Sequence, residues 1–71
     1  MWTPEKIREL RNAYGESQDA FCRRLGVTVN AVRIWEQGKG EPGGSAQVLL
    51  GRLEEDLRAD QAREEAEKQP A

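Results

Sequence analysis

The feature that most constrains the fold is a pair of short helical patterns, separated by a glycine, within residues 17–38. Ser17 is suited to cap the first helix, because its hydroxyl can accept a hydrogen bond from a backbone N–H in the first turn. Gly26 can adopt the left-handed conformation that commonly ends a helix. Between them, the apolar residues at helical spacing are Phe21, Cys22 and Leu25. The sequence therefore predicts a helix over residues 17–25.

The second pattern predicts a helix over residues 28–37. Thr28 is placed to cap it, Val32 and Trp35 mark its inner face, and Gly38 ends it. Two helices joined by so few residues must cross at a steep angle, which leaves the second helix exposed. This is the geometry of a helix-turn-helix, in which the second helix enters the major groove of DNA.

Two further helices are predicted, over residues 3–14 and 45–57, which makes the fold class a compact all-α, four-helix domain. Thr3 caps the first, and Trp2 precedes that cap as a hydrophobic staple or as an exposed anchor for a partner; the staple is preferred. Ser45 is placed to cap the fourth helix, whose apolar stripe consists of Ala46, Leu49, Leu50, Leu53 and Leu57. The residues expected to be largely buried are Ile7, Leu10, Phe21, Leu25, Val32, Trp35, Leu49 and Leu53.

The charge is divided unevenly along the chain. Residues 1–53 carry eight basic and six acidic side chains, whereas residues 54–71 carry three basic and seven acidic ones. We therefore expect a mildly basic DNA-binding domain over residues 1–57. Residues 58–71 form an acidic, polar tail that is either an extension of the last helix or disordered.

The composition argues against several classes of protein. The chain has no histidine and a single cysteine, Cys22, which lies in an apolar stripe and is expected to be a buried thiol. No metal site, cofactor or catalytic motif is indicated, so we expect a protein that is not an enzyme. A fused zinc-ribbon antitoxin is excluded by the missing cysteines. No apolar run suits a membrane and no signal peptide is visible, which predicts a cytoplasmic location.

Two charged residues lie on faces that are expected to be buried. Arg11 follows Ile7 by four residues on the inner face of the first helix, and Glu36 lies beside Trp35 on the inner face of the third. Because burying either charge alone is costly, we expect a partly buried ion pair between them. The alternative is that both side chains bend outward to water.

The motif Gln-x-x-Phe-Cys-x-x-Leu-Gly-Val-Thr, followed by Val-x-x-Trp-Glu-x-Gly, resembles the helix-turn-helix domain of the lambda-repressor-like (Xre) family. The resemblance covers about residues 7–53, and the Trp-Glu-x-Gly ending is its most specific part. Short bacterial and phage regulators and the antitoxins of toxin–antitoxin pairs belong to that family. The resemblance implies the same pairing of Arg11 with Glu36.

The resemblance also implies which residues contact DNA. The positions that face base edges are Val29, Asn30 and Ile34, and Arg33 can reach guanine or a flanking phosphate. Asn30 is suited to a bidentate contact with adenine, whereas Val29 and Ile34 can offer only apolar contact or mark a protein interface. Phosphate contacts are expected at the two ends of the third helix and at the start of the second, from Ser17, Gln18, Thr28, Gln37, Lys39 and Gly40. Gln18 is also expected to brace the start of the third helix.

Two functions from different classes remain open. The first is a sequence-specific DNA-binding transcriptional regulator that occupies a double-stranded operator. The alternative is an antitoxin or adaptor whose main role is binding another protein, such as a toxin; the acidic tail favours it. Because the basic part of the chain has few charges for phosphate, we expect a homodimer on two half-sites. The Leu50/Leu57 side of the fourth helix is the expected interface, unless these leucines only close the core of a monomer.

Overall fold

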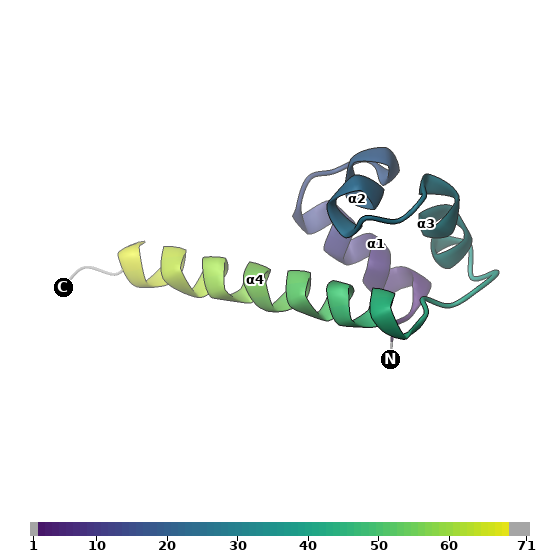
Figure 1. The fold of residues 1–71 in the computed structure, drawn as a ribbon. Helices are drawn as coiled ribbons and strands as arrows, with labels where there is room; N and C mark the ends of the chain where they lie inside the picture. Colours follow the sequence, from purple (N-terminus) through teal and green to yellow (C-terminus); the bar gives the residue numbers. More distant parts are fainter. Residues whose placement is uncertain (1, 69–71) are drawn as a thin grey trace.

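The computed structural model, which describes residues 2–68, contains four helices and no strand in that range. They are α1 (Pro4–Ala13), α2 (Gln18–Leu25), α3 (Val29–Glu36) and α4 (Gly44–Lys68). The first three form a compact group on one side of α4, and α2 and α3 follow each other as a helix-turn-helix (Figure 1). The prediction of an all-helical fold with four helices is confirmed.

The first three helices begin and end in the same way. The hydroxyls of Thr3, Ser17 and Thr28 each accept a hydrogen bond from a backbone N–H three residues later, at 3.1–3.2 Å. Each helix then closes on a glycine with a positive φ: Gly15, Gly26 and Gly38. Such caps satisfy backbone groups that a helix end leaves without partners. The bounds therefore agree with the predicted ranges to within one residue.

The core lies between the four helices. Phe21, Val32 and Leu50 are fully buried. The other buried apolar residues are Ile7, Leu10, Cys22, Leu25, Trp35 and Ala46. Trp2 packs against this core as the predicted staple, with Lys6 Nζ 4.7 Å from the centre of its ring.

The predicted orientation of α4 was wrong by one residue. Leu49, which was expected to be buried, is 36% exposed, whereas Leu50 is fully buried and Leu53 is half-buried. The face that packs on the core is formed by Ala46, Leu50, Leu53 and Leu57. Leu50 therefore cannot contribute to an intermolecular interface, and the Leu50/Leu57 side of this helix is occupied by the chain's own core.

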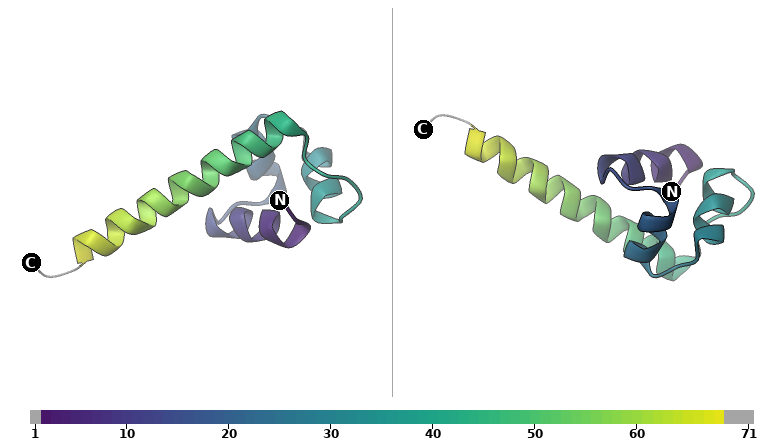
Figure 2. Two further views of the ribbon diagram at one scale, coloured as in Figure 1. Left: turned by 90° about the horizontal axis from the view of Figure 1, so that it is seen from below. Right: turned by 90° about the horizontal axis from the view of Figure 1, so that it is seen from above.

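Helix α4 begins one residue earlier than predicted, and of the two alternatives left open for its C-terminal part it adopts the helical extension. It begins at Gly44, so Ser45 lies inside the first turn, and the carbonyl of Gly43 accepts the first hydrogen bond from Gln47 N at 2.9 Å. It continues without a break through Lys68, so residues 58–68 extend the helix, while residues 69–71 lie outside the described part of the chain. The extension projects beyond the other helices, and the molecule measures 48 × 21 × 20 Å (Figure 2).

A tyrosine fixes the direction of this projecting helix. Tyr14, at the end of α1, donates a hydrogen bond from its hydroxyl to the backbone carbonyl of Leu53 in the middle of α4, at 2.7 Å. The guanidinium of Arg24 lies 4.5 Å from the centre of the Tyr14 ring and pairs with Glu16. Partial burial and the nearby carboxylate of Asp56 raise the pKa of the Tyr14 hydroxyl above its usual value.

Candidate nucleic-acid interface

Helix α3 lies at the surface, at the end of the molecule opposite to the projecting half of α4 (Figure 1). Only Gly26, Val27 and Thr28 separate it from α2, and its buried face consists of Val32, Trp35 and Glu36. Because one face of a short helix is fixed in the core, the other is held at the surface in a defined orientation. This is the arrangement in which a recognition helix contacts DNA.

The four residues predicted to contact bases differ in exposure. Asn30 and Arg33 are exposed, so their amide and guanidinium groups are accessible to a ligand. Val29 and Ile34 are half-buried and pack against the core, so they present only part of their apolar surface. The outer surface of α3 is consequently more polar than the sequence suggested.

The ion pair expected between α1 and α3 is confirmed. Arg11 Nε donates to Glu36 Oε2 at 2.8 Å, and Arg11 Nη2 donates to Glu36 Oε1 at 2.9 Å. This two-bond geometry is the strongest form of such a pair. A third group of Arg11, Nη1, donates to the backbone carbonyl of Glu16 at 3.1 Å. The side chain of Glu36 is 4% exposed, so its charge is neutralised inside the domain rather than by water.

Gln18 joins the same network. Its Nε2 donates to Glu36 Oε1 at 3.3 Å, which links the first turn of α2 to the last turn of α3. The expectation that Gln18 braces the start of α3 was wrong, because its amide contacts the end of that helix. The sequence signal for this bond was present in Glu36 itself, since a buried carboxylate accepts more hydrogen bonds than one arginine supplies.

The bond from Gln18 also shows how the predicted phosphate-contacting residues are grouped. It brings the start of α2 beside the end of α3, near the segment Gln37–Gly40 that follows. Thr28 lies at the other end of α3, about 12 Å away along an eight-residue helix. The candidate phosphate contacts therefore lie at both ends of α3, on either side of Asn30 and Arg33.

Helix α3 begins with groups that suit an anion. The Thr28 hydroxyl accepts from Ala31 N at 3.2 Å and keeps its own proton to donate. The first N–H groups of a helix have no acceptor inside it, and α3 has no acidic residue in its first turn. The first turn of α2 differs, because it contains Asp19, whose carboxylate pairs with Arg23 at 2.9 Å.

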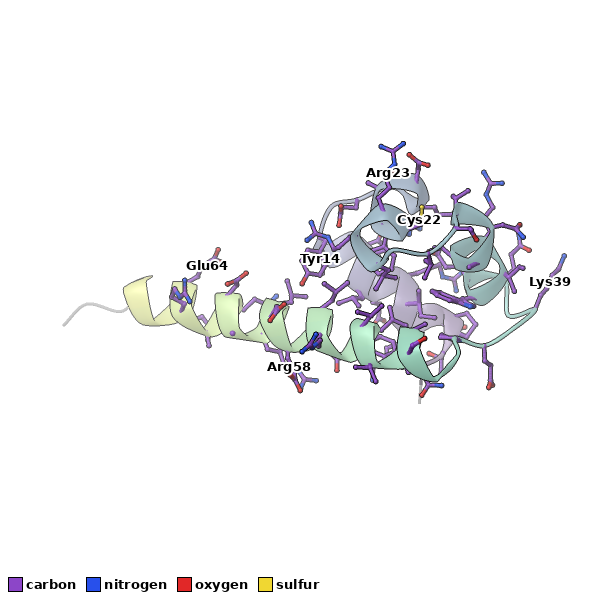
Figure 3. The ribbon with its side chains drawn as sticks, in the orientation of Figure 1. Tyr14, Cys22, Arg23, Lys39, Arg58 and Glu64 are labelled. Atoms are coloured by element: carbon purple, nitrogen blue, oxygen red, sulfur yellow. The ribbon has the colours of Figure 1, made fainter. Side chains whose placement is uncertain are left out.

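The segment after α3 lies tightly against it. Lys39 N donates to the carbonyl of Ile34 at 3.0 Å, across Gly38 in its left-handed conformation. A Cβ atom placed on Gly40 would lie 2.8 Å from Ile34 Cγ2, closer than side chains tolerate. A side chain at position 40 would therefore force Ile34 to shift, whereas glycine fits without any movement. The side chain of Lys39 extends outward at the end of the molecule opposite to Glu64 (Figure 3).

The charges on this surface are few and mostly positive. Arg33 and Lys39 are exposed, and Glu41 follows in the loop. Glu36 is the sole acidic residue of α3, and Arg11 neutralises it. The acidic residues of α4 lie on the projecting helix, which extends away from α3 (Figures 1 and 3). None of the helices in the described part of the chain is long and apolar enough to cross a membrane.

A comparison with curated proteins finds one of similar sequence. The chain is 33% identical to antitoxin HigA-2 of Vibrio cholerae serotype O1 over 48 residues, which are 68% of this chain and 46% of that antitoxin. The chain thus spans about half the length of the relative it matches. No family model matches the chain, and no solved structure matches it.

Proposed function

We propose that this protein is a sequence-specific DNA-binding regulator of the lambda-repressor-like (Xre) helix-turn-helix type, with α3 placed in the major groove. The observation that carries the proposal is the surface of α3, which exposes Asn30 and Arg33 while its sole carboxylate is buried against Arg11. Exposed basic groups neutralise phosphate charge, whereas an unpaired carboxylate on this surface would be repelled by the phosphates. In this proposal residues 1–57 form the DNA-binding domain and residues 58–71 the acidic tail.

Within the groove, Asn30 supplies the specific contact. Its amide nitrogen can donate a hydrogen bond to adenine N7 while its amide oxygen accepts one from the exocyclic amine of the same base. Arg33 contacts guanine or a flanking phosphate, and the exposed parts of Val29 and Ile34 contact thymine methyl groups. These four side chains all project from one short helix.

The phosphate contacts fix the position of that helix. At one end Thr28 and the free N–H groups of the first turn of α3 bind one phosphate. At the other end Ser17, Gln18, Gln37, Lys39 and Gly40 bind a second phosphate. Gln18 can serve both roles, because one amide hydrogen binds Glu36 and the other hydrogen remains for DNA.

The similarity to antitoxin HigA-2 favours a second function for the same protein. An antitoxin binds a toxin protein, and the acidic α4 extends well clear of the surface that we assign to DNA. We therefore propose the antitoxin role as the alternative, with a toxin as the protein partner and no catalytic activity of its own. A cytoplasmic location follows from either role.

The test is selection of duplexes from a random library, followed by fluorescence anisotropy on the selected and a scrambled duplex. Asn30→Ala is expected to reduce discrimination at one base pair by about 1–3 kcal/mol. Lys39→Ala is expected to weaken binding to every duplex alike and to flatten the dependence on salt. Arg58→Ala on the projecting half of α4, whose guanidinium pairs with Glu54 away from α3 (Figure 3), is the matched control and should change neither. If the selected and scrambled duplexes bind equally at moderate salt, the alternative replaces the DNA-binding function.

A further inference from the structure

The start of α1 and the loop after α3 lie side by side (Figure 1), and a pocket of about 180 Å³ lies between them. Its apolar lining includes the half-buried Trp2 and the buried Ile7, Trp35 and Pro42. Both tryptophans of the chain therefore line the same pocket. An apolar cavity of about 150 Å³ binds a benzene molecule. This pocket is thus large enough for one aromatic ring with a short side chain.

The charges around the pocket favour a cation. Glu41 is the sole charged side chain that lines it, and this carboxylate forms no ion pair among the described residues. The ammonium of Lys6 lies 4.7 Å from the centre of the Trp2 ring, but Lys6 lines a separate groove between α1 and α4. The faces of indole rings carry partial negative charge and attract cations. A ligand with a carboxylate, in contrast, would be repelled by Glu41.

We infer that this pocket is a binding site for a small organic cation, an aromatic ring that carries a primary ammonium on one or two carbons. The ring packs among Trp2, Ile7 and Trp35 and removes their remaining apolar surface from water. The ammonium pairs with the carboxylate of Glu41 at the rim. Because this pair is open to water, it determines which ligands bind more than how tightly they bind.

Part of the pocket comes from residues outside the helix-turn-helix pattern. Trp2, Thr3 and Pro4 precede the span of about residues 7–53 that resembles the lambda-repressor-like family. Thr3 caps α1, and a Cβ atom placed on Gly38 would lie 3.6 Å from Pro4 Cγ. The start of α1 is thus fixed beside the end of α3, and Trp2 with it. The resemblance to the family implies no such pocket.

The pocket adjoins the segment Gln37–Gly40, to which we assign a phosphate contact. Gly38 and Gly40 line the pocket, while the side chain of Lys39 between them extends outward (Figure 3). Glu41 follows directly, and its negative charge opposes a phosphate at this segment. A cation bound to Glu41 neutralises that charge, so the ligand strengthens binding to DNA, and DNA strengthens binding of the ligand by the same factor. This coupling rests on the proposed function, whereas occupancy of the pocket does not.

The site is tested on the full chain without DNA, by NMR of the two tryptophan indole N–H signals. The probe is benzylamine, which is protonated at neutral pH. We expect both signals to shift and to saturate with a Kd of about 1–10 mM, because so small a ligand makes few contacts. Benzyl alcohol has the ring without the charge, and methylamine has the charge without the ring. Each should bind at least about threefold more weakly than benzylamine.

Glu41→Gln removes the charge of this side chain and keeps its shape. The variant should bind benzylamine about threefold more weakly and benzyl alcohol as the wild type does. Glu64→Gln, at the opposite end of the molecule (Figure 3), is the matched control and should bind benzylamine like the wild type. The site is overturned if neither indole signal shifts. Equal affinities for benzylamine and benzyl alcohol, or for the wild type and Glu41→Gln, overturn the assignment of a cation.

The coupling is tested by fluorescence anisotropy on the selected duplex with about 10 mM benzylamine, against methylamine at the same ionic strength. The wild-type protein is expected to bind DNA about twofold more tightly with benzylamine. Glu41→Gln is expected to bind DNA more tightly than the wild type without ligand, and to respond less to benzylamine because it binds less of it. An unchanged wild-type affinity refutes the coupling and leaves the pocket in place. Duplexes that all bind alike contradict the proposed function instead, and the indole signals still report on the site.

Discussion

Removing Arg11 tests how the core tolerates the charge of Glu36. In Arg11→Ala, the buried carboxylate keeps its hydrogen bond from Gln18 but loses two bonds and its compensating charge. Breaking a buried pair in this way costs about 3–5 kcal/mol. Because the Arg11 side chain is 19% exposed, water can enter the space it leaves, and we expect the lower value, about 3 kcal/mol. That loss is a large fraction of the roughly 4–10 kcal/mol that a chain of this length has available.

The measurement is urea unfolding followed by far-UV circular dichroism, with a thermal scan alongside. A loss of about 3 kcal/mol lowers the melting temperature by about 12–24 °C in a domain of this size. The matched control is Arg23→Ala, because Arg23 and Asp19 are also 2.9 Å apart but are 79% and 61% exposed. We expect that control to lose less than about 1 kcal/mol. Equal losses in the two variants would refute the explanation based on burial.

Two further predictions concern α4 and its anchor. Leu50→Ala should cost about 2–5 kcal/mol in urea unfolding, whereas Leu49→Ala should cost under about 1, and the reverse order would contradict the orientation of α4 described above. Tyr14 is the chain's single tyrosine, and its raised pKa means that folding favours the neutral phenol. The contribution of Tyr14 to the stability of the fold is therefore complete below about pH 10 and is lost as the pH rises through the folded-state pKa. Tyr14→Phe should lower the free energy of unfolding by about 0.5–1.5 kcal/mol at neutral pH and should remove this loss of stability at alkaline pH. Urea unfolding between neutral pH and pH 11 measures both effects. If the variant loses as much stability at alkaline pH as the wild type, the loss comes from groups other than Tyr14.

The sequence was sufficient for the features that depend on neighbouring residues. The first three helices were placed to within one residue because a hydroxyl begins each and a glycine follows each. The pairing of Arg11 with Glu36 was predictable for another reason, since a charge on a buried face needs a partner wherever that partner comes from.

The features that were wrong or missed depend on how whole helices approach one another. Leu49 and Leu50 are adjacent in the sequence, and only the contact with α1 and α2 decides which one enters the core. The bond from Tyr14 to the carbonyl of Leu53 spans 39 positions and has no sequence signal, because every residue has a carbonyl. The length of α4 was left open because its polar second half has no apolar stripe to mark it.

The contact between Gly40 and Ile34 fixes the order in which these two positions can be substituted. A side chain at position 40 cannot enter while Ile34 Cγ2 occupies that space, whereas a smaller residue at position 34 would vacate it. Relatives with a smaller residue at position 34 would thus become free to vary at position 40 only after that change. A substitution at position 40 that is harmful in this protein would be tolerated in those relatives. The effect of a substitution at position 40 therefore depends on which residue already occupies position 34.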